Sequence, residues 1–169
     1  CRLKSPASRG RRPVMNILVV GGGGREHAII KKLRENRTVE KIWALPGNGG
    51  IARDAECVDI KATDIDGIVG FAKQAKPDYA VVAPDDPLAA GMVDALEKQG
   101  IRAFGPRQKA AQIEASKAFA KDLMQKYDIP TAGYRVFSQS AQALDYVAQC
   151  EYPVVVKADG LALGKGVII

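Results

Sequence analysis

The amino-acid sequence predicts an α/β protein, in which a doubly wound parallel sheet is followed by the start of a second domain. From Asn16 onward, short apolar runs alternate with segments of helical periodicity, as is typical of parallel strands covered by helices. Three of the apolar runs are followed at once by turns rich in glycine or proline. Near the other end, an apolar run closes on a lysine, and a glycine-rich loop and a further apolar run follow.

Four apolar runs predict the strands of the first domain. NILVV (16–20) is continuously apolar, as expected of a strand buried on both faces of a sheet. KIWAL (41–45), DYAVVA (78–83) and IRAF (101–104) follow the same pattern. We therefore expect four parallel strands, with their loops at the carboxyl edge where such sheets bind ligands.

Three segments between these runs predict helices. Arg25 to Asn36 carries Ala28, Ile29 and Leu33 at helical spacing. Asp64 can cap a helix that continues to about Lys76. Apolar residues from Leu88 to Leu96 form one face of a third helix.

The pattern changes from about Ala115, where a second domain begins. A helix with one apolar face ends near Pro130, and YRVF (134–137) predicts a strand. Residues 140–150 predict a helix, and residues 153–169 predict a strand, a loop and a strand.

The chain accordingly divides into three parts. We assign residues 1–14 to a disordered basic leader, residues 15–112 to the doubly wound domain and residues 113–169 to an incomplete second domain. The leader holds five Arg or Lys residues and no acid, within a chain of net charge +6. The remainder has 20 basic and 19 acidic residues. This balance argues against nucleic acid as a partner.

Composition also bears on the cellular location of the protein. The apolar runs are far shorter than the roughly 20 residues that cross a bilayer, so we expect no membrane segment. Cys57 and Cys150 lie far apart, without metal-binding spacing. These features favour a reducing, cytoplasmic location.

The first glycine run, Gly21 to Gly24, leads directly into a predicted helix. Free backbone N–H groups and the positive end of the helix dipole favour a phosphate there, and Arg25 would add a charge-assisted donor. A dinucleotide fingerprint requires a third glycine where Glu26 or His27 stands. The second strand also lacks a terminal acid for a ribose, so a nicotinamide cofactor is disfavoured. A tight turn that binds nothing is the alternative.

Two further loops follow strands, PGNGG (46–50) and PDDP (84–87). They should lie on the same sheet edge as the first glycine run. Asp85 and Asp86 could cap the next helix or accept hydrogen bonds from an amine or a sugar hydroxyl. His27 is a binding candidate to which the sequence assigns no acid–base role.

The loop after Lys157 has glycines at 160, 164 and 166, with Lys165 among them. Glycines allow backbone N–H groups to approach a polyphosphate, which the two lysines would neutralise. The sequence does not fit GxxxxGK[ST], because Asp159 occupies the first glycine position. An ordinary glycine-rich hairpin is the alternative.

In order, GGGGREHA, PGNGG, PDDPL, FGP with AAQIEASKAFAKDLM, IPTA and PVVVKADGLALGKGV resemble the phosphoribosylamine–glycine ligase family of purine synthesis. The resemblance covers Met15 to Ile169 and implies a doubly wound domain followed by an ATP-grasp domain of α+β type. It implies the ligation of glycine to 5-phosphoribosylamine with ATP through a glycyl phosphate. The family commonly has Gly-Pro-Glu where this chain has Ala83-Pro84-Asp85.

The resemblance also implies roles for individual residues. Contacts to the phosphoribosylamine would come from Gly21, Gly22, Gly23, Gly24, Arg25, Glu26, Pro46, Gly47, Asn48, Asp85 and Asp86. Contacts to ATP would come from Lys117, Lys157, Asp159, Gly160, Gly164, Lys165 and Gly166.

No catalytic residue is identified, and ligands for Mg²⁺ or Mn²⁺ are expected beyond residue 169. We expect a fragment, inactive by itself, of a monomeric enzyme that uses glycine, phosphoribosylamine and ATP. A stand-alone phosphate- or nucleotide-binding module is the alternative function.

Overall fold

Five parallel strands form the main sheet of the computed structural model, which describes residues 14–162 and 165–169. The strand order is β3-β2-β1-β4-β5, so the chain starts at the centre and winds outward in both directions. This confirms the predicted doubly wound sheet. The strands are β1 (Met15–Gly21), β2 (Val39–Pro46), β3 (Glu56–Cys57), β4 (Tyr79–Val82) and β5 (Ala103–Phe104).

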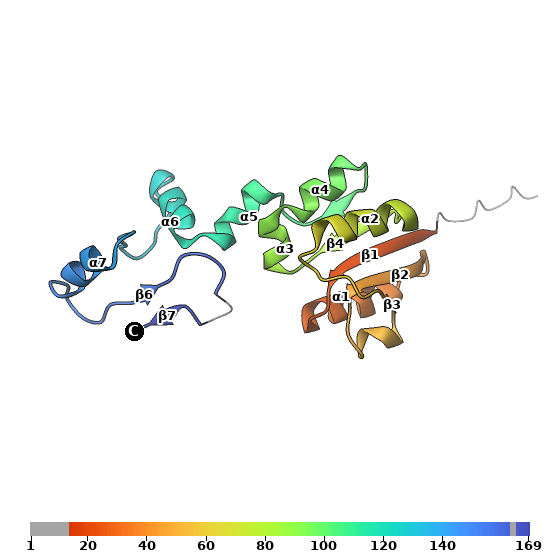
Figure 1. The fold of residues 1–169 in the computed structure, drawn as a ribbon, viewed down its shortest axis with the longest axis horizontal. Coiled ribbons are helices and arrows are strands. Elements are labelled where there is room, and N and C mark those ends of the chain that lie inside the picture. The colour runs from red at the N-terminus through yellow and green to blue at the C-terminus, as the bar shows by residue number, and fades with distance from the viewer. Residues whose placement is uncertain (1–13, 163–164) are drawn as a thin grey trace, which may run out of the picture.

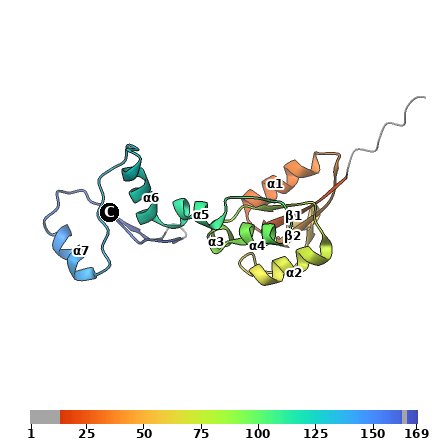
Figure 2. The same ribbon diagram turned by 90° about the horizontal axis from the view of Figure 1, so that it is seen from above.

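Both faces of this sheet are covered by helices, which explains why β1 is continuously apolar. Leu18 and Val20 pack into one cluster with residues of α2 and α4, and Ile17 and Val19 pack into another with Ile30 of α1. Figure 2 shows α1 on one face of the sheet and α2 on the other. The covering elements are α1 (Gly24–Arg34), η1 (Ile51–Arg53), α2 (Ile65–Ala75), α3 (Asp85–Ala90) and α4 (Met92–Lys98).

The first domain differs from expectation at two places. The two-residue strand β3 was not predicted. In addition, the helix expected over Leu88 to Leu96 is divided into α3 and α4 at Gly91. Gly91 has φ +93, a left-handed conformation that ends a right-handed helix.

The second part of the chain extends away from the sheet (Figure 1). It consists of three helices and one antiparallel pair of short strands in the described residues. Beyond Ala111, none of the described residues is buried. The elements are α5 (Gln108–Ala115), α6 (Lys117–Lys126), α7 (Ser140–Val147), β6 (Val156–Lys157) and β7 (Val167–Ile168).

The strand predicted at 134–137 is wrong, because this segment has no strand assignment. Its first residue, Tyr134, instead donates a hydrogen bond through its hydroxyl to Asp122 Oδ1 on α6, at 2.6 Å. Extended backbone becomes a stable strand only when a neighbour pairs with it. Among the described residues, no strand pairs with this segment.

Some expectations fall outside the described residues or stay predictions. Residues 1–13 of the expected leader, and Gly164 of the glycine-rich loop, lie outside the part that the structure describes. The boundary between 15–112 and 113–169 stays a prediction; α5 extends across it. No helix in the described residues has the length and apolar character needed to cross a membrane.

Candidate functional site

The first glycine run connects β1 to α1, and a buried carboxylate braces it. Glu26 is only 3% exposed, and its Oε2 accepts a hydrogen bond from the Gly23 backbone N–H at 2.6 Å. Among the described residues, the other oxygen, Oε1, has no hydrogen-bond partner. Glu26 therefore lies behind the turn and shapes it, since its side chain also fills the space beside Gly21.

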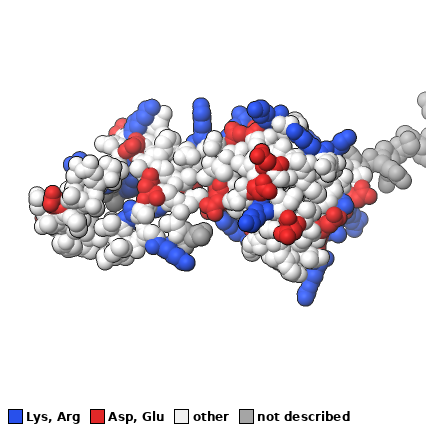
Figure 3. All heavy atoms as spheres, in the orientation of Figure 1, with Lys and Arg blue, Asp and Glu red and all other residues white. Residues whose placement is uncertain are grey.

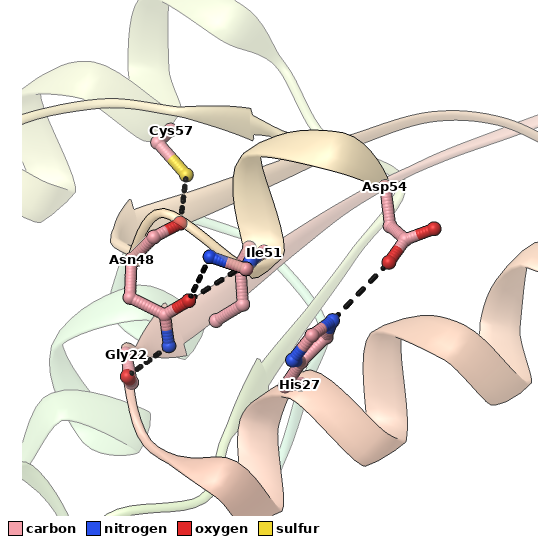
Figure 4. Close-up of polar contacts among 7 residues, drawn as sticks. Gly22, His27, Asn48, Ile51, Asp54 and Cys57 are labelled. Carbon is pink, nitrogen blue, oxygen red and sulfur yellow. Dashed lines mark hydrogen bonds and ion pairs between the residues drawn. The ribbon is translucent and has the colours of Figure 1, made fainter.

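The second loop lies directly against this turn (Figure 4). Asn48 Nδ2 donates to the Gly22 carbonyl oxygen at 2.7 Å, and the Gly47 backbone N–H donates to the Gly21 carbonyl oxygen at 3.2 Å. A Cβ at Gly22 would collide with the Gly47 carbonyl oxygen. The structure thus brings together the two loops that the sequence placed on one edge of the sheet.

The same asparagine also folds its own loop. Asn48 Oδ1 accepts hydrogen bonds from the backbone N–H groups of Gly50 and Ile51, both at 2.8 Å. The Asn48 side chain thus joins two loops and bonds to the backbone at the start of η1. Neither role was predicted from the sequence, although asparagine in a turn commonly bonds to the backbone just after it.

His27 lies beside this loop and pairs with an acid. Its Nε2 is 3.2 Å from Asp54 Oδ2, at the end of η1, and both side chains are about a quarter exposed. Figure 4 shows His27 and Asp54 facing each other between α1 and η1. This contact gives His27 a structural partner that sequence reasoning missed.

The third loop places two carboxylates near the first glycine run. Asp85 and Asp86 lie in the first turn of α3, where Pro84 occupies the N-cap position without a side-chain cap bond. Arg25 Nη1, from α1, is 3.7 Å from Asp85 Oδ1. The structure therefore brings these two predicted site residues together across the ends of β1 and β4.

Three of the predicted nucleotide residues, Lys117, Asp159 and Gly160, meet at the start of α6. Lys117 Nζ donates to the Gly160 carbonyl oxygen at 2.7 Å, and Asp159 Oδ1 accepts from the Lys117 backbone N–H at 2.7 Å. Lys157 is exposed in β6. Lys165 and Gly166 lie just before β7.

Hydrogen bonds lower the pKa of Asp159 below its ordinary value. The Ala118 backbone N–H is the largest cause, and the Ser116 hydroxyl and the Lys117 N–H act in the same direction. Each of these donors stabilises the charged carboxylate more than the neutral acid.

A cavity of about 560 Å³ separates the two groups of predicted residues. Arg25, Asp85 and Asp86 line it from the sheet domain, and Lys117 and Lys157 line it from the second part. Charges of both signs thus face one space from two parts of the chain. Such an arrangement can hold a phosphorylated molecule on one side and an anionic co-substrate on the other.

No group of three or more potential metal ligands occurs within residues 14–162 and 165–169. On the face shown in Figure 3, both acidic and basic side chains lie over the sheet domain.

A doubly wound sheet, with a second part that ends in an antiparallel strand pair, makes this an α/β protein. Family models give its class as ATP-grasp. The model described as phosphoribosylglycinamide synthetase, N domain, matches residues 15–114, and that described as phosphoribosylglycinamide synthetase, ATP-grasp (A) domain, matches residues 115–169. The chain belongs to the phosphoribosylglycinamide synthetase family, which confirms the resemblance drawn from the sequence.

Curated relatives lead to the same family. The chain is 52% identical over 155 residues to phosphoribosylamine–glycine ligase of Caldanaerobacter subterraneus, and 53% identical over 156 residues to that of Listeria innocua. Each match covers 92% of this chain and 37% of the relative. The chain thus spans little more than a third of the length of these proteins.

Solved structures share the fold. The crystal structure of phosphoribosylamine–glycine ligase from Thermotoga maritima matches with a TM-score of 0.70 and 30% identity, covering 90% of this chain and 35% of that one. The biotin carboxylase domain of 2-oxoglutarate carboxylase from Hydrogenobacter thermophilus matches with a TM-score of 0.74 and 19% identity, covering 93% of this chain and 37% of that one. The second likeness concerns the fold alone.

Proposed function

We propose that this chain forms the phosphosugar side and part of the nucleotide side of a ligase. The enzyme would join glycine to 5-phosphoribosylamine at the expense of ATP, giving glycinamide ribonucleotide. The observation that carries the proposal is the cavity, where Arg25, Asp85 and Asp86 face Lys117 and Lys157. The names of the 52–53% identical relatives support the same reaction.

The phosphosugar would bind at the carboxyl edge of the sheet. The free N–H groups at the start of α1 and the guanidinium of Arg25 suit its phosphate. Gly47 bonds to Gly21 and Asn48 bonds to Gly22, so the glycine run has a fixed shape. Asp85 and Asp86 would accept hydrogen bonds from the sugar hydroxyls or the amine. Glu26 would act indirectly, through the shape of the turn.

ATP would bind on the other side of the cavity. Lys117, Lys157 and Lys165 would neutralise its phosphates, and the loop from Asp159 to Gly166 would close over them. The Hydrogenobacter protein, which shares the fold, was solved with MgADP. The described residues hold no metal-ligand group, so we assign no step of the reaction to Mg²⁺ or Mn²⁺ here.

The reaction would proceed in two transfers. A carboxylate oxygen of glycine attacks the γ-phosphorus of ATP, the bond to the bridging oxygen breaks, and ADP leaves. The amine of phosphoribosylamine then attacks the carbonyl carbon of glycyl phosphate, phosphate leaves, and the nitrogen loses a proton. Both steps depend on charge neutralisation and on positioning more than on a protein nucleophile. The closed loop would keep water from the acyl phosphate.

A chimera tests this proposal, because it supplies the parts of the ligase that the relatives have beyond the matched region. Residues 15–169 would replace the matching part of the Caldanaerobacter ligase, and ADP and glycinamide ribonucleotide would be measured. We expect product only when glycine, phosphoribosylamine and ATP are all present. Lys157→Ala should lower the rate about 100-fold, the order expected for one electrostatic contact to a reacting group. Lys109→Ala, on α5 and outside the cavity, should change it less than twofold.

The negative results are equally informative. A folded chimera that makes no more product than its Lys157→Ala variant would refute the ligase proposal. If the unmodified chain nevertheless binds ribose 5-phosphate, the stand-alone phosphate-binding module becomes the better function. We further propose a monomeric, cytoplasmic protein, which sedimentation and fractionation would test.

A further inference from the structure

Asp159 connects the glycine-rich loop to helix α6 through several hydrogen bonds. Its Oδ1 accepts from the backbone N–H groups of Lys117 at 2.7 Å and Ala118 at 3.2 Å. The Ser116 hydroxyl donates to the same carboxylate, 3.1 Å from Oδ2. These residues lie 41 to 43 positions apart in the sequence. The bonds therefore join two distant segments.

The first turn of α6 explains why a carboxylate lies there. A helix leaves its first backbone N–H groups without partners inside the helix, and its dipole favours negative charge at that end. Ser116 Oγ, at the N-cap, accepts from the Phe119 N–H at 3.1 Å. Asp159 accepts from the two N–H groups that remain nearest the cap. Asp159 of the loop and Ser116 at the N-cap together supply hydrogen-bond acceptors for the first backbone N–H groups of α6.

A second hydrogen bond is donated by a side chain of α6 to the backbone of the loop. The half-buried Lys117 donates through Nζ to the carbonyl oxygen of Gly160, at 2.7 Å. The backbone of Lys117 is thus held by Asp159, while its side chain holds the next residue of the loop. We name residues 116–118 and 159–160 the loop clamp. Figure 1 shows the chain after β6 curving toward α5 and α6, where the clamp forms.

We propose that Asp159 is a positioning residue, which sets the root of the glycine-rich loop against α6 so that Lys117 and Lys157 face the same cavity. Asp159 would not contact the nucleotide, because its carboxylate is already engaged by donors of α6. A free carboxylate at this place would repel the phosphates that the lysines attract. The part of this inference that concerns phosphates rests on the proposed function, but the clamp itself does not.

The clamp can be tested in the unmodified chain by NMR. The amide signals of Lys117 and Ala118 should shift with pH as Asp159 titrates, with a midpoint below the ordinary aspartate value of 3.8. Because the folded-state pKa is lowered, the clamp is fully present above that ordinary value and is lost as the pH falls through the lowered one. Asp159→Asn should abolish the titration.

Three variants give the clamp a matched comparison. Asp159→Asn should speed amide exchange at Lys117 and Ala118 about three- to tenfold, the range expected for one weakened hydrogen bond. Ser116→Ala removes one donor and should raise the midpoint of the titration. Asp145→Asn, an exposed aspartate on α7, should change neither. The clamp would be overturned if the amide signals of Lys117 and Ala118 did not shift between pH 2 and 6. It would also be overturned if they titrated in Asp159→Asn as they do in the wild type.

Nucleotide binding tests the positioning role. ADP would be titrated into the wild-type chain, Asp159→Asn, Lys117→Ala and the double variant. If Asp159 positions both lysines, its substitution should weaken binding about threefold or more in the wild type and less in the Lys117→Ala background, where only Lys157 can still be misplaced. Additive losses would show that Asp159 acts independently of Lys117, which contradicts the proposal.

A failure of the proposed function can be distinguished from a failure of the clamp. If the wild-type chain binds no ADP while its amides titrate as expected, the nucleotide assignment fails and the clamp stands. In that case amide exchange at Gly160 and Leu161 decides the positioning role. Faster exchange at these residues in Asp159→Asn than in Asp145→Asn supports it, and equal exchange refutes it.

Discussion

Gly47 occupies a place in the second loop that no larger residue fits. Its φ is +71, and a Cβ would meet Cys57 Sγ and the side chain of Ala44. The loop is nevertheless held close to the first glycine run, because Asn48 donates to the Gly22 carbonyl oxygen. Backbone conformation at one residue therefore controls how the two loops of the proposed phosphosugar site meet.

Gly47→Ala should destabilise the chain by about 1 to 3 kcal/mol, the range for one residue forced into an unfavourable backbone conformation. The matched control is Gly49→Ala in the same loop, where a Cβ would meet no atom within 4 Å. Urea denaturation of both variants measures the difference. Equal midpoints for the two variants would show that the loop adapts without strain.

Tyr134 allows a second test at the level of one residue. Its hydroxyl donates to Asp122 Oδ1 at 2.6 Å, which raises its pKa above the ordinary 10.0; burial and the Asp122 charge act in the same direction. The bond stabilises the neutral phenol, so it is fully present below pH 10 and is lost as the pH rises through the raised value. Asp122→Ala should return the titration of Tyr134, followed by carbon NMR, toward pH 10. An unchanged midpoint would contradict this bond, and Asp145→Ala serves as the control.

At the scale of elements, the long strands were predictable, whereas the short strand β3 was not. The apolar runs at 16–20, 41–45 and 78–83 correspond to β1, β2 and β4, because strands buried on both faces need continuous apolar sequence. The two-residue strand β3 is exposed and pairs with only part of β2. Its short sequence carries no periodic signal, so only the folded sheet defines it.

Part of the candidate site could likewise be predicted from the sequence, and part could not. The sequence predicted that the loops at 21–24, 46–50 and 84–87 share one edge, because parallel strands align their carboxyl ends. It did not predict that Glu26 lies buried behind the first turn, or that Asp159 bonds to α6. Both features depend on which segments lie close together in the folded chain, and neither periodicity nor residue type gives those distances.

Helix α2 allows a direct test of a helix N-cap that was predicted from the sequence. Asp64 was predicted to cap this helix, and its Oδ1 accepts from the Gly67 backbone N–H at 2.9 Å. Asp64→Ala should cost about 0.5 to 2 kcal/mol, whereas Asp64→Asn should cost little, since asparagine caps equally well. Urea denaturation distinguishes the two. Similar losses for both would mean that the charge of Asp64, and not its cap bond, stabilises the helix.

At the scale of the whole molecule, the two parts of the chain differ in how much they bury. The sheet domain has two apolar clusters on opposite faces of its sheet. Beyond Ala111, the described residues include no buried side chain, and large apolar groups are open to solvent: Leu144 is 69% exposed and Ile168 is 72% exposed. Exposed apolar surface of this kind marks a region that other protein surface can cover.

Amide hydrogen exchange should therefore divide the chain near residue 116. Amides of β1, β2 and β4 should exchange slowly, because they open only when the sheet domain unfolds. Amides of α7, β6 and β7 should exchange faster by several orders of magnitude, because little burial opposes their local opening. In the chimera with the Caldanaerobacter ligase, these same amides should become protected if the rest of that enzyme covers them. Slow exchange of α7 and β6 in the chain by itself would show that the second part has a stable core of its own.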